Sequence, residues 1–97
     1  MKNYFITVFN RYDNYGIHST RCWGYYPNWE DANEVVHNNM TDLWEYTYDY
    51  AVIEEIKPGI SSYAYPRWFY KYNQETNKYN MIEEPEELKH FCNFGVG

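Results

Sequence analysis

Three stretches of the chain alternate between apolar and polar positions with period two, which predicts three β-strands. They cover residues 3–10, 18–26 and 46–56. Large strand-forming side chains occupy both sides of the first stretch, so we expect this strand to be covered on both faces. Lysine, proline and glycine at positions 57–59 predict a turn after the third stretch.

The second stretch carries an arginine among aromatic residues. Strict alternation places Arg21, Trp23 and Tyr25 on one face of the predicted strand. Gly24 lies between aromatic residues, where it either permits a bulge or relieves crowding beside Trp23. Both interpretations stay open at the level of the sequence.

One segment changes to a spacing of three and four residues, which predicts a helix over residues 28–39. Its apolar positions are Trp29, Ala32, Val35, Val36 and Met40. Asn28 is a favourable N-cap residue, and Asp31 adds negative charge at the positive end of the helix dipole. The apolar stripe predicts that this helix packs on one face of the sheet.

The last third of the chain predicts a β-hairpin and a short helical turn. Residues 67–73 and 78–83 flank four polar residues, a length that suits a hairpin connection. Pro85 is tolerated in the first turn of a helix and opens a helical turn that ends near residue 90. The tail, residues 91–97, is apolar, so we expect it to pack against other parts of the protein.

Together these elements predict an α+β fold. We expect a mostly antiparallel β-sheet with one principal helix packed on a face and a short C-terminal helical turn. The chain has 97 residues and no stretch rich in proline, glycine or serine divides it. A single domain, residues 1–97, is therefore expected.

Aromatic residues are unusually frequent, with 13 Tyr, 4 Trp and 5 Phe making up 23% of the chain. Such rings either cover a half-buried sheet or form rigid contact surfaces at interfaces and base-stacking sites. This number of rings exceeds what one small core encloses easily. We therefore expect the protein to form a stable homo-oligomer.

Charge and cysteine content restrict the partners. A net charge of −6 argues against binding to long DNA or RNA, whereas one or two arginines suffice to hold a small phosphorylated ligand. Cys22 and Cys92 occur without a secretory signal, which favours a cytoplasmic location. In that compartment two reduced thiols are favoured over a disulfide between them. Neither a metal site, a cofactor nor a membrane span is predicted.

The sequence favours binding over catalysis. Neither a nucleophile elbow nor a glycine-rich phosphate loop is present in the sequence. The adjacent carboxylates Glu54 and Glu55 point to opposite faces of a strand, and the acidic run at residues 83–87 is typical of a solvated helix start. We therefore do not expect an enzyme.

The three arginines of the chain each stand beside or near aromatic residues. A guanidinium can form a fork on a phosphate while a neighbouring ring stacks on a base, although an ordinary ion pair with a nearby acid explains each arginine as well. Near the end of the chain, Asn93 either supplies amide donors to a ligand or forms a turn that seats Phe94 in the core. The candidate ligand-binding residues are Arg11, Tyr12, Arg21, Trp23, Tyr25, Arg67, Trp68 and Asn93.

Three segments carry a resemblance: RCWGYY at residues 21–26, EYTYDYAVIEE at 45–55 and CNFGVG at 92–97. Over nearly its whole length the chain resembles a family of small proteins from Firmicutes and their phages. Its length and aromatic pattern are also similar to those of the phage anti-CBASS sponge proteins. This resemblance implies a homo-oligomer, a tetramer or a dimer, that traps cyclic dinucleotides such as cyclic GMP-AMP in the cytoplasm of an infected bacterial cell without cleaving them.

Two other functions stay open from the sequence. An acidic protein inhibitor could dock on a basic surface of a host defence protein, with tyrosine and tryptophan as its main contacts. A small hydrolase would show turnover, whereas a sponge would return its ligand intact.

Overall fold

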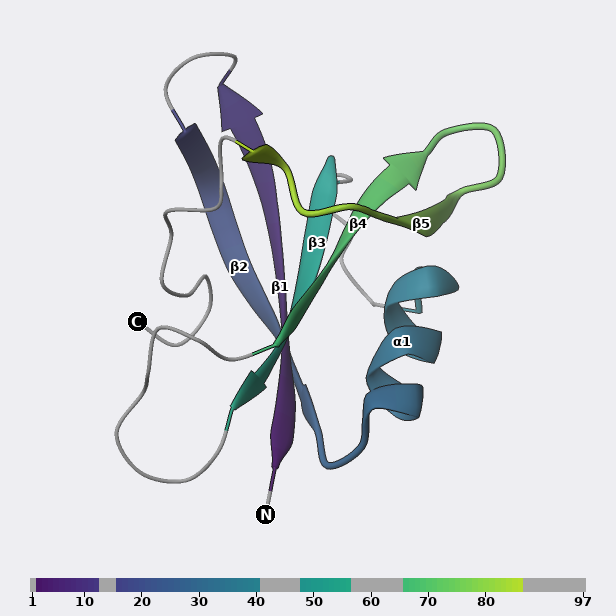
Figure 1. Cartoon of the computed structure of the whole chain (residues 1–97). Helices are drawn as coiled ribbons and strands as arrows, with labels where there is room; N and C mark the ends of the chain where they lie inside the picture. Colours follow the sequence, from purple (N-terminus) through teal and green to yellow (C-terminus); the bar gives the residue numbers. More distant parts are fainter. Residues whose placement is uncertain (1, 13–15, 41–47, 57–65, 87–97) are drawn as a thin grey trace.

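Five strands form one antiparallel sheet, and the described helix packs against one of its faces (Figure 1). The structure is a computed structural model that describes residues 2–12, 16–40, 48–56 and 66–86. Its elements are β1 (Asn3–Tyr12), β2 (Gly16–Tyr26), α1 (Trp29–His37), β3 (Tyr50–Ile56), β4 (Arg67–Asn73) and β5 (Lys78–Ile82). The strands lie in the order β2-β1-β3-β4-β5. This arrangement confirms the predicted α+β fold.

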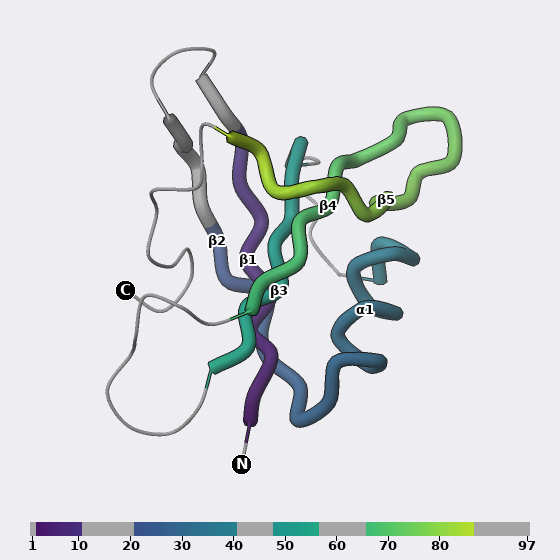
Figure 2. Tube along the Cα trace, in the orientation of Figure 1, coloured from purple at the N-terminus to yellow at the C-terminus, as the bar shows by residue number. Residues whose placement is uncertain are grey.

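Among the described elements, α1 follows β2 in the chain and precedes β3. β1 and β2 are consecutive neighbours, whereas β3 pairs with the other side of β1 (Figure 2). Because both are antiparallel to β1, β2 and β3 run in the same direction, and α1 connects them across one face. We call this the helix face and the opposite side the back face.

Local sequence explains the ends of the helix. Asn28 accepts a hydrogen bond from the backbone N–H of Asp31 at 2.9 Å through its side-chain oxygen, as an N-cap residue does. After His37 the chain leaves the helix, and Asn39 has a φ of 52°, which asparagine adopts more easily than most residues. The helix and the β4–β5 hairpin agree with the predicted segments. β3 begins at Tyr50, later than the predicted start at residue 46: Tyr48 and Asp49 are not part of the strand, and residues 46 and 47 lie outside the described chain.

The helix face holds the larger hydrophobic core. Its fully or nearly fully buried residues are Ile6, Val8, Ala32, Val36, Tyr48, Ala51, Ile53, Tyr70 and Tyr79. Two buried hydroxyls in this core have acceptors: Tyr70 donates to Asn33 Oδ1 at 2.6 Å, and Tyr79 donates to the backbone oxygen of Tyr48 at 2.8 Å. The apolar stripe of α1 covers the sheet through Ala32 and Val36, which are buried, and through Trp29 and Val35, which pack against this core. The prediction was wrong for Met40, which lies beyond the end of the helix and is 58% exposed.

The back face has a smaller core in which Phe9, Val52 and Phe69 are buried. These three side chains lie on the three central strands, β1, β3 and β4. With Ile6 and Val8 buried on the helix face, the expectation that the first strand is covered on both faces is confirmed. The predicted C-terminal helical turn and the tail lie almost entirely outside the described residues, which end at residue 86.

A bulge in β2 corrects the predicted faces of that strand. Gly24 lies opposite Ile6 and Cys22 lies opposite Thr7, so Trp23 is an extra residue in the ladder. Gly24 has a φ of 135°, a conformation that glycine adopts without steric cost. Beyond the bulge the alternation is reversed, and Tyr25 therefore lies on the back face while Trp23 packs on the helix face. Strict alternation had placed them together.

Candidate functional site

Arg67 and Trp68, which the sequence suggested as one arginine–aromatic pair, lie on opposite faces of β4. Trp68 is opposite Ile53, a helix-face residue, and its ring lies 6.2 Å from Tyr4 and 5.7 Å from Trp29. Arg67 is opposite Glu54, one position along β3, and so belongs to the back face. The two side chains of one chain therefore cannot contact the same small ligand.

Trp23 also belongs to the helix-face core rather than to an open surface. Its ring meets Tyr79 edge-on with the centroids 5.8 Å apart. Arg21 lies opposite Val8, on the same side of the sheet, and its side chain is exposed. Of the predicted pair, Arg21 is accessible at the sheet edge while Trp23 contributes to packing.

The structure does bring two other predicted residues, Tyr25 and Arg67, onto one face. Tyr25 is opposite Phe5, Phe5 is opposite Glu54, and Glu54 is opposite Arg67. These four residues form one row across the back face, which we call the Tyr25–Arg67 row. Three strand spacings of about 4.8 Å give the row a backbone length of roughly 14 Å.

The aromatic end of the row is open to solvent. Tyr25 is 60% exposed, and its ring stacks on Phe5 with a centroid distance of 5.1 Å and an interplanar angle of 28°. A ring held in this way offers a pre-oriented flat surface at the sheet edge.

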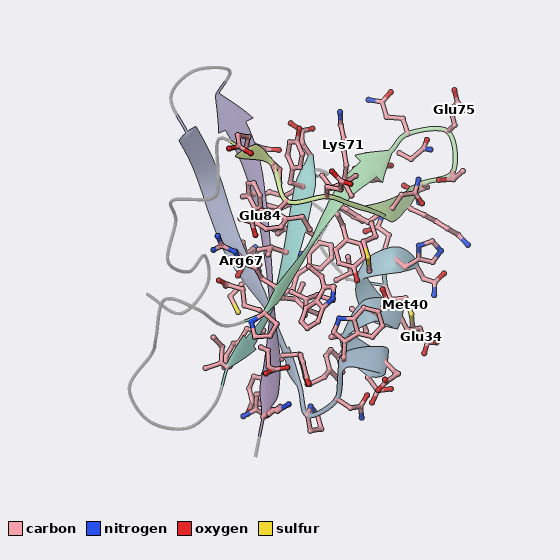
Figure 3. All side chains as sticks on the ribbon, viewed as in Figure 1. Glu34, Met40, Arg67, Lys71, Glu75 and Glu84 are labelled. Carbon is pink, nitrogen blue, oxygen red and sulfur yellow. The ribbon has the colours of Figure 1, made fainter. Side chains whose placement is uncertain are left out.

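The charged end of the row is largely buried. Arg67 Nε donates to Glu84 Oε1 at 3.1 Å and Nη2 donates to Oε2 at 3.3 Å, a bidentate ion pair (Figure 3). The Arg67 side chain is 10% exposed, and its guanidinium carbon lies 5.6 Å from the ring centre of Phe69. Glu54 beside it is fully buried. Charges withdrawn from water interact more strongly than exposed ones, so the electrostatic interactions within this cluster are stronger than those of an exposed ion pair.

Three predicted residues are only partly described or lie outside the described chain. Arg11 and Tyr12 end β1, where their backbones pair with Ile17 and Gly16, and their side chains lie outside the description. Asn93 lies beyond residue 86. The predictions for the side chains of these three residues therefore fall outside the described residues.

Sequence reasoning missed a groove of about 440 Å3 at the β4–β5 hairpin. It is lined by Lys71, Tyr72, Asn73, Gln74, Glu75, Asn80 and Ile82. The available signal was the alternation of lysine and asparagine across the two hairpin strands, which places Lys71 directly opposite Asn80. Polar strand residues usually indicate a solvated face, so this signal was weak.

The pKa values of three tyrosines are raised by burial and by neighbouring groups. Burial raises the pKa of Tyr70, and burial with the nearby Tyr72 raises the pKa of Tyr79. The pKa of Tyr4 is raised by desolvation and by the carboxylate of Glu55, to which its hydroxyl donates at 3.2 Å. These tyrosines stay neutral donors and are poorly suited to act as bases at neutral pH.

Comparisons with other proteins leave the family open: no family model, curated protein or solved structure matches this chain. Within residues 2–12, 16–40, 48–56 and 66–86, no three potential metal ligands cluster together. The described helix is too short and too polar to cross a membrane.

Proposed function

We propose that the protein binds a cyclic dinucleotide, such as cyclic GMP-AMP, and sequesters it without cleaving it. The observation that carries this proposal is the Tyr25–Arg67 row, which combines an exposed stacked ring with a guanidinium on one face. A base needs a flat surface to stack on, and a phosphate needs charge-assisted donors. The row supplies one of each.

Glu84 indicates how Arg67 would hold a phosphate. The Glu84 carboxylate already receives two parallel N–H bonds from the guanidinium. Two phosphate oxygens present a similar fork and the same sign of charge. A ligand phosphate would replace Glu84 in this pairing, and the displaced carboxylate, which is partly exposed, would turn to solvent.

Sequestration fits the interactions that the row offers. Stacking and charge-assisted hydrogen bonds hold a ligand in place and leave its covalent bonds unchanged. A cyclic dinucleotide has two bases and two phosphates, whereas one row presents one exposed ring and one guanidinium. We therefore propose that a second copy of the chain, in a dimer or tetramer, completes the site.

Ligand release from the purified protein tests the function. The protein is incubated with a panel of cyclic dinucleotides, washed and denatured, and the released nucleotide is identified by mass spectrometry. We expect intact ligand in a fixed ratio to protein. Release of cleaved product would indicate an enzyme, and release of no nucleotide would overturn the proposal.

Paired arginine variants locate the site. Arg67→Ala and Arg21→Ala remove the same charge, but Arg21 lies on the helix side of the sheet edge. The Tyr25–Arg67 row requires that Arg67→Ala loses binding while Arg21→Ala retains it. The opposite result would move the site to the helix face, beside Arg21 and Trp23.

The acidic outer surface of α1 favours a second candidate, an inhibitor that docks on a basic surface of a host defence protein. Glu30, Asp31 and Glu34 are all exposed on this helix, in a chain with a net charge of −6. Such charges accelerate association with a basic partner. This function requires a protein partner and predicts no retention of nucleotide by the purified chain.

A further inference from the structure

The groove at the β4–β5 hairpin lies on the back face, at a distance from the Tyr25–Arg67 row. Lys71 and Arg67 share the same side of β4 and are four residues apart, which corresponds to roughly 13 Å along a strand. Figure 3 shows Lys71 and Glu75 at the hairpin end of the sheet, away from Arg67. The groove has a volume of about 440 Å3 and is widely open to solvent.

Lys71 supplies the positive charge of the groove. Its side chain is exposed, and Nζ lies 5.9 Å from the ring centre of Tyr50, which stacks in turn on Phe9 at 5.5 Å. Among the residues that the structure describes, no carboxylate lies within ion-pair distance of Lys71. An ammonium group held beside a ring is a suitable donor for one anionic group.

Carboxamides surround this charge. Asn80 lies directly opposite Lys71, and Gln74 follows Asn73 into the turn. The Asn73 side-chain oxygen accepts the backbone N–H of Glu75 at 2.9 Å, which fixes the turn that forms one wall. A carboxamide offers an acceptor and two donors in one plane, the combination that pairs with the edge of a purine base.

Glu75 and Ile82 narrow the choice of ligand. Both residues line the groove. Ile82 offers an apolar surface to a flat ring, and the Glu75 carboxylate is an acceptor for an exocyclic amino group. The Glu75 carboxylate also repels ligands with several negative charges, since like charges at short range are unfavourable. The groove therefore suits one phosphate and one base better than a di- or triphosphate.

We propose that this groove is a second binding site, which takes a purine nucleoside monophosphate. The phosphate pairs with Lys71, and the base edge meets Asn80 and Gln74. The proposal is independent of the Tyr25–Arg67 row, because the two places share no lining residue.

Titration with adenosine monophosphate and guanosine monophosphate, followed by amide chemical shifts and calorimetry, tests the groove. We expect saturable binding with shifts confined to the β4–β5 hairpin, and weaker binding of the matching nucleosides, of inorganic phosphate and of the triphosphates. Absence of saturable binding by the parent protein, or shifts outside the hairpin, would overturn the proposal.

A charge-matched control distinguishes a direct contact between Lys71 and the ligand from the effect of a changed net charge. Lys71→Gln should weaken binding about three- to tenfold, the loss expected for one partly exposed charge-assisted contact. Lys78→Gln removes the same charge from the neighbouring strand, at a residue that does not line the groove, and should change affinity by less than about twofold. Equal effects of both substitutions would show that Lys71 has no specific role. Because cyclic dinucleotides are tested separately at Arg67, the two proposals can fail independently.

Discussion

Arg67 and Trp68 are adjacent in the chain, yet the guanidinium of Arg67 pairs with Glu84 on the back face while the indole of Trp68 packs against Trp29 under the helix. Side chains of adjacent strand residues point to opposite faces of a sheet, so these two neighbours have different surroundings. Substitutions at the two positions should therefore affect different properties.

Trp68→Ala should lower the free energy of unfolding by about 2–4 kcal/mol, because it removes a large ring from the helix-face core at a position that is only partly buried. Arg67→Lys keeps the charge and should cost less stability, about 1 kcal/mol, through loss of the bidentate geometry. Urea denaturation of both variants measures the difference. A smaller loss for Trp68→Ala than for Arg67→Lys would contradict the assignment of the two faces.

Glu84→Gln should strengthen binding of a cyclic dinucleotide, because the neutral amide competes less well than a carboxylate for the Arg67 guanidinium. The expected gain is about three- to tenfold, the equivalent of one charge-assisted contact. Glu83→Gln serves as the control, since it removes the same charge at an exposed neighbour. If neither variant alters affinity in a protein that binds the nucleotide, Glu84 does not occupy the ligand position.

Stability should fall in alkaline solution because of Tyr70 and Tyr79. Burial holds their pKa values above the ordinary value of about 10, so the folded state keeps two protons that the unfolded chain releases. Their contribution to the free energy of unfolding is complete below about pH 10. Above that pH it decreases by about 1.4 kcal/mol per pH unit for each tyrosine. Denaturation curves on both sides of this pH measure the slope.

Tyr70→Phe provides the check on this slope. The variant has one fewer shifted group, so its stability should decrease less steeply above about pH 10 than that of the parent. Its stability at neutral pH should be lower, since the Asn33 side-chain oxygen loses its donor. Parallel slopes for parent and variant would show that Tyr70 titrates normally in the folded state.

Gly24→Ala should destabilise the protein by about 1 kcal/mol or more, although a Cβ at this position meets no atom within 4 Å. The cost arises from the φ of 135°, which is unfavourable for alanine. Cys22→Ala, at an exposed position two residues away on the same strand, should change stability by less than about 0.5 kcal/mol. Thermal denaturation distinguishes the two, and equal effects would exclude strain at the bulge.

Local patterns predicted the elements of this fold, but they did not predict which side chains meet. The helix cap at Asn28 and the four-residue hairpin turn depend on neighbours in the chain, and the sequence was sufficient for both. The Tyr25–Arg67 row depends on the bulge at Trp23 and on the register of three strand pairs. A shift of one residue in any of them would change the members of the row, and local propensity does not determine that register.

The pairing of β1 with β3 has a consequence for how the chain folds. These two central strands are separated by the whole of β2 and α1, so their pairing closes a long loop and forms late compared with the local β1–β2 hairpin. During synthesis the hairpin emerges from the ribosome before β3 and presents the inner side of β1 with its hydrogen-bonding groups unpaired. Pairing with β3 therefore does more than complete the sheet, because it also covers a strand edge on which another chain could pair.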